Sequence, residues 1–140
     1  MNTLIKITFT FLLFVLTSCT AQDKDNNTAF EISYVAQTRG SIVSINFKEI
    51  NLIYKSNTDE KSTVLSKVQV DSINNIVYSI KLSEIANLTA PSNKRFTDGA
   101  LSARFTIKKN NRSYESIEFD HGNPPKELKD IYLLLEKYSK

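Results

Sequence analysis

The chain contains few of the residues from which common catalytic and metal-binding sites are built. It has one cysteine, one histidine and three glycines among 140 residues. A lone thiol excludes a disulfide within the chain and any metal site made of several cysteines. The sequence also has no Gly-x-Ser-x-Gly turn, no His-Glu-x-x-His helix and no glycine-rich phosphate loop. We therefore expect no bound metal ion and no organic cofactor.

An excess of charge of one sign is also absent. Lys and Arg number 18 and Asp and Glu number 15, which gives a formal net charge of +3. The basic residues are spread along the chain, and the pairs Lys94-Arg95 and Lys108-Lys109 each lie beside a predicted turn. Because nucleic-acid binding relies on a concentrated basic surface, we expect no nucleic-acid partner.

No apolar run in the sequence has the length of a membrane-spanning helix. The longest run, residues 7–16, follows Lys6 and falls well short of the ~20 apolar residues that such a helix needs. A positive residue followed by an apolar stretch of this size is typical of a signal peptide. We predict that residues 1–18 are the signal peptide of a lipoprotein.

The end of this run, Leu16-Thr17-Ser18-Cys19, looks like a lipobox. In a lipobox, small residues fit the signal peptidase and the cysteine thiol receives diacylglycerol before cleavage. Several acyl chains on Cys19 would hold the protein far more firmly than the single chain that gives reversible binding. We therefore predict a cell-envelope protein anchored in a membrane, with the outer membrane favoured and the leaflet left open. The alternative is an ordinary signal peptide that happens to end in a cysteine.

The rest of the chain divides into a tether and one domain. Residues 19–28 are polar and lack apolar periodicity, which is typical of a flexible tether. Residues 29–140 have the length at which a single compact domain with a real hydrophobic core forms.

Alternation of apolar and polar residues predicts three consecutive antiparallel strands between residues 30 and 54. A tight turn at Arg39-Gly40 would place Ile32 opposite Phe47. A second turn at Lys48-Glu49 would place Phe47 opposite Ile50. In this arrangement the inward apolar residues share one face. A shift of the pairing register by one residue would instead expose all the apolar side chains of a strand to water.

A polar loop is predicted at residues 56–61, and a helix after it, because Ser66-Lys67-Val68-Gln69 reads as a capping box. Strands at 101–108 and 114–119 form a second hairpin. A two-residue loop there would place Ala103 opposite a glutamate. We therefore favour a three-residue loop, which places Ala103 opposite Ile117.

A last helix is predicted after Asn123-Pro124-Pro125, because Asn caps helices and Pro is tolerated in a first turn. The predicted order is three strands, a helix, two strands and a helix. Helices that follow runs of hairpin strands are typical of an α+β fold. We expect an antiparallel sheet of about five strands with both helices on one face.

The second hairpin would gather polar residues at one end of the sheet. A histidine beside a carboxylate can act as a general base, so the cluster is a candidate hydrolytic or ligand-binding site. The competing interpretation is that these residues only form turns and satisfy backbone donors. The candidate residues, with one arginine from the first hairpin, are Arg39, Arg95, Asp98, Asp120 and His121.

Aromatic residues offer a second candidate surface, because tyrosine and phenylalanine rings can line a glycan-binding site. Their spacing assigns most of them to the core instead. They are Phe30, Tyr34, Phe47, Tyr54, Tyr114, Tyr132 and Tyr138.

Four segments occur in the order Thr38-Arg39-Gly40, Ala90-Pro91-Ser92, Asp98-Gly99-Ala100 and residues 119–125, which read Phe-Asp-His-Gly-Asn-Pro-Pro. With them, the mature chain resembles a group of short uncharacterised bacterial envelope lipoproteins. The resemblance covers most of residues 30–138, and it carries no catalytic role over to any residue of this chain.

These observations favour a membrane-anchored envelope lipoprotein that acts as a non-enzymatic binding module. Its expected partner is another envelope protein or a glycan. The alternative is a small hydrolase or inhibitor module that uses the Asp, His and Arg cluster. A third hypothesis, a carrier of an apolar ligand, needs a deep cavity between helices and sheet, and the well-matched apolar strands favour a filled core.

Overall fold

The computed structural model describes residues 30–140. The predicted signal peptide (residues 1–18), the predicted lipidation site Cys19 and the predicted tether (residues 19–28) lie outside the described residues. Among residues 30–140, no helix has both the length and the apolar character needed to cross a membrane.

The described part of the chain contains seven strands, two α-helices and three short 3-10 helices. The strands are β1 (Phe30–Thr38), β2 (Ser41–Lys48), β3 (Asn51–Ser56), β4 (Glu60–Val64), β5 (Ser102–Lys109), β6 (Arg112–Glu115) and β7 (Phe119–Asp120). The helices are α2 (Lys67–Ser79), η2 (Leu82–Asn87), η3 (Lys94–Thr97), η4 (Lys126–Leu128) and α3 (Lys129–Ser139).

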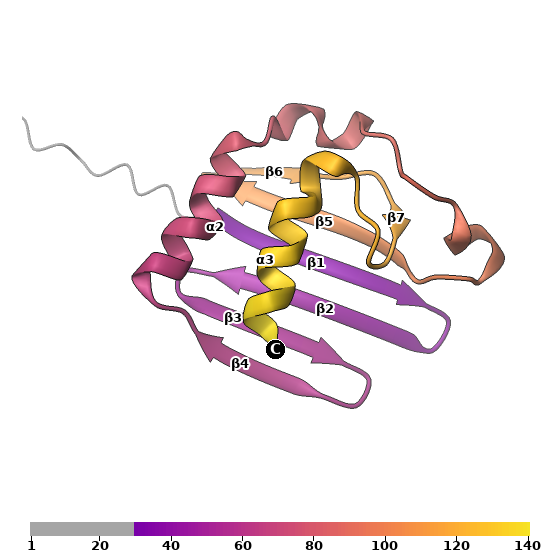
Figure 1. Cartoon of the computed structure of the whole chain (residues 1–140), viewed down its shortest axis with the longest axis horizontal. Helices are drawn as coiled ribbons and strands as arrows, with labels where there is room; N and C mark the ends of the chain where they lie inside the picture. The colour runs from indigo at the N-terminus through magenta and orange to yellow at the C-terminus, as the bar shows by residue number, and fades with distance from the viewer. Residues whose placement is uncertain (1–29) are drawn as a thin grey trace, which may run out of the picture.

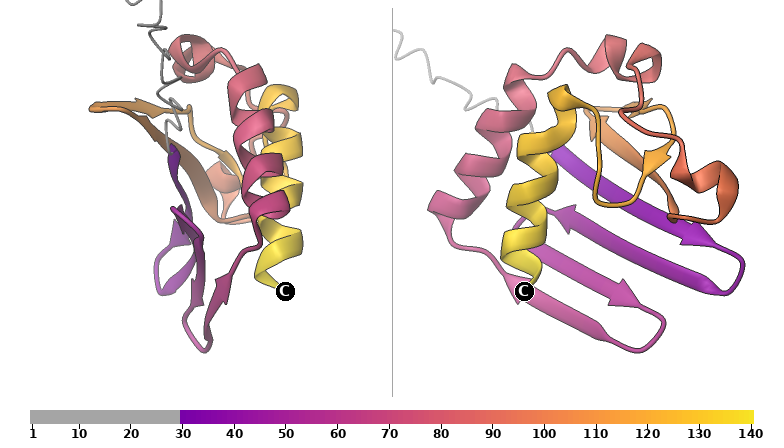
Figure 2. Two further views of the ribbon diagram at one scale, coloured as in Figure 1. Left: turned by 90° about the vertical axis from the view of Figure 1, so that its left-hand side faces the viewer. Right: turned by 45° about the vertical axis from the view of Figure 1, so that its right-hand side comes forward.

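The strands form one antiparallel sheet in the order β4-β3-β2-β1-β5-β6, with β7 paired to β5. Figure 1 shows α2 and α3 lying across one face of this sheet. The side view in Figure 2 places both in one layer, and no described helix covers the other face. This confirms the predicted α+β class and the packing of both helices on one face. The sheet has seven strands rather than about five.

The first hairpin has the predicted register, with Ile32 opposite Phe47. The predicted register of the β2–β3 hairpin is wrong by two residues, because Phe47 lies opposite Leu52 rather than Ile50. The turn is made by Glu49, at a φ of 57°, and Ile50. A shift of two residues leaves Leu52 on the inner face, where it is buried, whereas Ile50 falls in the turn and is exposed.

The predicted loop at residues 56–61 is too long, because β4 begins at Glu60 and pairs with β3, where Asn51 lies opposite Val64. This strand lies at the edge of the sheet and is almost entirely exposed. Its side chains therefore lack the apolar alternation that reveals half-buried strands.

The three-residue loop predicted between β5 and β6 is also wrong. β5 and β6 are joined by Asn110 and Asn111 alone, and Asn110 adopts a φ of 53°. The chain leaves the ladder after Glu115 and pairs again at β7, where Phe119 lies opposite Ala103. Residues 116–118 thus act like a β-bulge, which avoids the mismatch of Ala103 with a glutamate and buries Phe119.

The core lies between the sheet and the two helices. The central strand β1 contributes every second residue to it, as expected for a half-buried strand. The largest fully buried side chains are Tyr34, Phe30, Phe47, Phe105, Phe119, Ile32, Leu52, Ile73, Ile85, Ile107, Leu128 and Ile131.

Candidate functional site

Asp120 is the centre of a buried polar cluster where β7 pairs with β5. It is 2% exposed, and both of its carboxylate oxygens accept hydrogen bonds. Ser92 Oγ donates to Oδ2 at 2.5 Å, and the main-chain amides of Lys94 and Arg95 donate at 2.8 and 2.9 Å. The Arg95 guanidinium lies 3.2 Å from Oδ1. Asp120 therefore fastens the loop that leads into η3 to the sheet.

These contacts also set the charge of Asp120. Its burial alone would raise the pKa of the carboxyl. The hydrogen bonds from the Ser92 hydroxyl, from the Arg95 and Lys94 amides and from the Arg95 guanidinium outweigh burial and hold the pKa well below its usual range. The carboxylate is thus ionised at neutral pH and fully occupied by donors. A carboxylate in this state is poorly suited to act as a general base.

A β-turn separates Asp120 from His121. The main-chain amide of Asn123 donates to the main-chain carbonyl of Asp120 at 2.9 Å, and Gly122 has a φ of 79°. A positive φ at the third residue alone is the mark of a type II turn, and glycine is favoured there. The side chain of Asn123 donates to Ser92 Oγ at 2.7 Å, which ties the turn to the loop before η3.

His121 is bonded to a phenol rather than to a carboxylate. Its Nδ1 lies 2.7 Å from the Tyr34 hydroxyl. Burial lowers the pKa of His121, although Glu136 opposes this, and burial raises the pKa of Tyr34, so both groups are neutral at pH 7.

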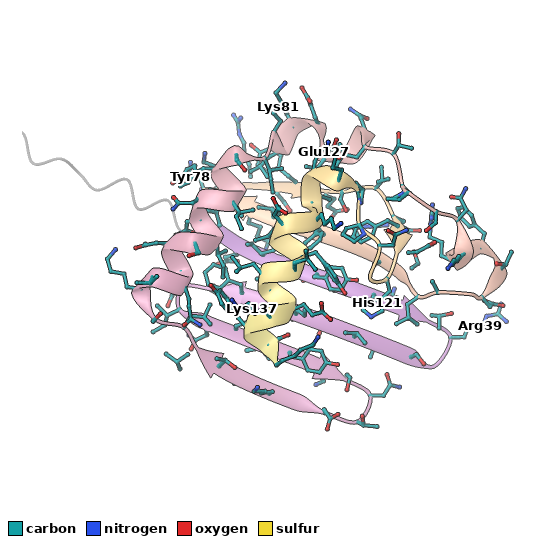
Figure 3. The ribbon with its side chains drawn as sticks, viewed as in Figure 1. Arg39, Tyr78, Lys81, His121, Glu127 and Lys137 are labelled. Carbon is teal, nitrogen blue, oxygen red and sulfur yellow. The ribbon has the colours of Figure 1, made fainter. Side chains whose placement is uncertain are left out.

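The other two candidate residues lie apart from this cluster. Asp98 ends η3 with a φ of 55° and is exposed, and its side chain has no hydrogen bond within residues 30–140. Arg39 is exposed in the β1–β2 turn, and Figure 3 shows it at the tip of that hairpin, away from His121. The structure therefore brings Arg95 and Asp120 together, turns His121 toward Tyr34, and leaves Arg39 and Asp98 at the surface.

A cleft of about 570 Å³ opens between α3 and the strands β2, β3 and β4. His121 and Tyr132 lie on its inner side, and Tyr132 is almost completely buried. The Tyr132 and Tyr34 rings pack with their centroids 5.3 Å apart, which connects the cleft to the core. The lining residues are Val43, Ile45, Tyr54, Asp59, Glu60, Lys61, His121, Tyr132, Glu136, Ser139 and Lys140.

The charged groups of the cleft lie at its rim and compensate one another. Lys140 Nζ is 3.1 Å from Glu136, and Glu60 is 3.3 Å from Lys55 outside the lining. Lys61 Nζ donates to the main-chain oxygen of Lys140, which closes the end of α3 onto β4. The cleft therefore combines an aromatic and aliphatic floor with a polar rim of low net charge.

Sequence reasoning found only part of this cleft. His121, Tyr54 and Tyr132 were candidate residues, but Glu136 and Lys61 carried no recognisable signal. Glu136 belongs to an ordinary amphipathic helix, and Lys61 to an edge strand without apolar alternation. Only the packing of α3 over β4 brings the two to one site.

Within residues 30–140, no group of three or more His, Cys, Asp and Glu side chains is arranged to hold a metal ion. Comparison with known proteins finds no family model, no curated protein and no solved structure that matches this chain.

Proposed function

We propose that the protein is a lipid-anchored, non-enzymatic binding module of the bacterial envelope and that its cleft binds a neutral glycan. The observation that carries this proposal is the cleft itself, with its apolar aromatic floor and its polar, charge-balanced rim. Anchoring through Cys19 is supported by the lipobox at residues 16–19.

The size and lining of the cleft support a small ligand or the end of a chain. Ligand sites commonly have volumes of roughly 300–1,000 Å³ and combine hydrophobic walls with a few oriented polar groups. A sugar ring has both features, since its C–H face packs on an aromatic ring such as that of the partly exposed Tyr54. Its hydroxyl groups donate to carboxylates such as Glu136 and accept from donors such as Lys61.

The balance of charge at the rim favours a neutral ligand. Lys61 and Lys140 offset two of the three acids Asp59, Glu60 and Glu136, and Lys55 pairs with Glu60 just outside the lining, so no strong field of one sign attracts an ion. The five charged side chains of the lining argue against a purely apolar ligand, because burying them would cost desolvation free energy. The apolar-carrier hypothesis is therefore the weaker interpretation of this cleft.

The hydrolase or inhibitor hypothesis draws less support from the geometry. It requires His121 to be oriented by a carboxylate, whereas Nδ1 is bonded to Tyr34 and the Asp120 carboxylate is occupied by Ser92, Lys94 and Arg95. A non-enzymatic module needs neither arrangement.

The proposal is tested by screening the mature acylated protein, held in lipid nanodiscs, against an array of neutral mono- to tetrasaccharides. Hits are then titrated calorimetrically. We expect at least one glycan to bind with a Kd below about 1 mM, and the variant Glu136→Gln to weaken it by at least fivefold.

Glu127→Gln provides the matched control, because it is the same substitution at a residue of η4 that lies outside the cleft (Figure 3). It should bind as the unchanged protein does. Absence of glycan binding, or equal weakening in both variants, would contradict the proposal. An envelope protein captured through the cleft in place of a sugar would favour a protein ligand.

A further inference from the structure

We propose that one end of the sheet, where a row of strand ends lies, rests against the lipid surface in which Cys19 is anchored. We call this end of the sheet the Phe30 edge and define it by the strand ends Phe30, Lys48, Asn51, Val64, Lys109 and Arg112. This inference rests on the proposed lipid anchor and adds the orientation of the domain on the membrane.

The strand registers place these six residues in one row. Lys109 lies opposite both Phe30 and Arg112, and Asn51 lies opposite both Lys48 and Val64. The pairing of β1 with β2 joins the two halves, because Glu31 next to Phe30 lies opposite Lys48. In Figure 1 the row forms the side of the sheet where β1 begins and β2 and β5 end.

Exposed apolar side chains gather at this edge. Val64 is 69% and Val68 74% exposed, and Ile50 and Tyr78 are each about half exposed. The Leu65 amide donates to the Ile50 carbonyl at 2.7 Å, which brings Ile50 next to Val64, and Val68 follows in the first turn of α2. These are four of the eight large apolar residues exposed in the described chain. Gathered apolar groups of this kind mark an interaction surface.

Aromatic and basic groups at the same edge suit a lipid headgroup layer. The Lys109 ammonium lies 5.1 Å from the Tyr78 ring centroid and 5.6 Å from that of Phe30. Tyrosine is enriched at membrane interfaces, where its ring meets the apolar region and its hydroxyl meets water.

Basic residues outnumber acidic ones around the Phe30 edge, which favours contact with anionic headgroups. Lys48 and Lys108 both lie near the Glu31 carboxylate, at 2.8 and 3.8 Å, and so one acid is shared by two cations. The cations are Lys48, Lys67, Lys108, Lys109 and Arg112, and the acids are Glu31, Glu49 and Asp71.

The length of chain before β1 favours the membrane as the surface that contacts the Phe30 edge. Ten residues separate Cys19 from Phe30, and eleven peptide steps reach at most roughly 40 Å. A compact domain of about 110 residues has a radius of gyration of about 13 Å. The point where the chain enters the sheet therefore stays within about one domain diameter of the bilayer, and the side of the domain that carries Phe30 meets a high effective concentration of lipid.

This orientation would direct the cleft away from the membrane. The cleft includes Asp59 and Glu60, which lie where β3 turns into β4, at the end of the sheet opposite the Phe30 edge. A ligand would then approach from the side that the bilayer leaves open.

Site-directed spin labelling tests the proposal on the full acylated protein in vesicles of phosphatidylethanolamine and phosphatidylglycerol. Acylation consumes the only native thiol, so Val68→Cys introduces a unique labelling site at the edge. Phe96→Cys is the matched control, since Phe96 is 73% exposed and lies in η3, beyond the far end of the sheet. We expect the ratio of oxygen accessibility to nickel-chelate accessibility to be at least three times higher for the label at 68 than for the label at 96. The label at 96 should remain exposed to water.

Reversing the charge of two basic residues at the Phe30 edge extends the test. Lys109→Glu with Arg112→Glu should reduce the accessibility ratio at position 68 at least twofold, whereas Arg39→Glu with Lys94→Glu should leave it unchanged. Labels at 68 and 96 that are equally aqueous on bound protein would overturn the proposal and leave the anchor intact. A label at 68 shielded from both reagents would also overturn it and indicate a covering protein. Protein that does not bind vesicles at all would overturn the anchor and the orientation together.

Discussion

Asp120 shows how one side chain organises a segment that has little regular structure. The loop between η2 and β5 has few apolar residues to hold it, and a buried carboxylate provides hydrogen-bond acceptors for four of its groups. Breaking a buried ion pair by removing one partner is strongly destabilising, because the remaining charge is left unpaired. Arg95 is that partner here, with a side chain 9% exposed.

We predict that Asp120→Asn lowers the thermal unfolding midpoint by on the order of 10 °C. The amide is neutral and has one oxygen, so it cannot serve the Arg95 guanidinium and the loop amides together. Differential scanning calorimetry at pH 7 measures the change. Asp98→Asn is the control, because Asp98 is exposed and makes no side-chain hydrogen bond among the described residues; its midpoint should move little.

The acid side of the stability curve provides a second readout of the same substitution. The pKa of Asp120 is depressed in the folded protein, so its carboxylate stabilises the fold above the unfolded pKa of about 4. That contribution is lost as pH falls below this value, and the midpoint of Asp120→Asn should therefore fall less steeply there. Parallel curves for the two proteins would contradict the role assigned to Asp120.

At the residue scale, sequence reasoning placed Arg95 beside Asp120, as the structure does, but it did not find the hydrogen bond between His121 and Tyr34. Asp120 and His121 are adjacent in the chain, which suggested a shared site. The type II turn at Gly122 separates their side chains, and the bulge at residues 116–118 shifts the register of β7. Neither feature has a signature strong enough to be read before the fold is known.

At the element scale, the start of α2 follows local rules. Ser66 Oγ accepts from the Gln69 amide, and the Gln69 side chain accepts from the Ser66 amide at 2.8 Å. This is the predicted capping box, and it is confirmed. A capping box involves only four consecutive residues, so it can be recognised without tertiary information.

We predict that Ser66→Ala destabilises the protein by about 1 kcal/mol, the usual cost of losing a side-chain N-cap. Chemical denaturation measures the free energy of unfolding, and Ser66→Asp should restore most of it. Ser72→Ala tests specificity in the same helix, since Ser72 only donates back to the Val68 carbonyl. It should be neutral or slightly stabilising. Equal losses at both positions would show that the cap has no special role.

Strands were harder to delimit than helices. Apolar alternation identified β1, β2, β3 and β5, each of which has one buried face. It did not identify β4, because an exposed edge strand has no alternation to detect. Turn positions were also uncertain, because Glu49 and Asn110 adopt positive φ values without being glycine.

At the scale of the whole molecule, the Phe30 edge and the β3–β4 end of the cleft lie at opposite ends of the sheet. The chain enters the sheet at Phe30, and the cleft opens near the β3–β4 turn at the other end. Such a module would present its site to the compartment while its opposite edge contacts lipid.

Lipid anchoring is tested directly by phase partitioning. We predict that the mature protein enters the detergent phase of Triton X-114, and that Cys19→Ser moves at least ninety per cent of it to the aqueous phase, because the acyl chains are lost. Ser18→Ala keeps a small residue in the lipobox and should leave partitioning unchanged. Mass spectrometry of natural protein with a free thiol, or with residues 1–18 still attached, would contradict the anchor.

The sequence by itself determined the class of fold, the inner faces of the main strands, the cap of α2 and the expectation of a lipid anchor. Each depends on residues that are close in the chain, where period, spacing and composition carry the information. The tertiary structure alone decided the seventh strand and the register of β7, the bond between His121 and Tyr34, and the cleft beneath α3. These arise from contacts between residues far apart in the chain, and their free energy depends on how helices and strands pack together.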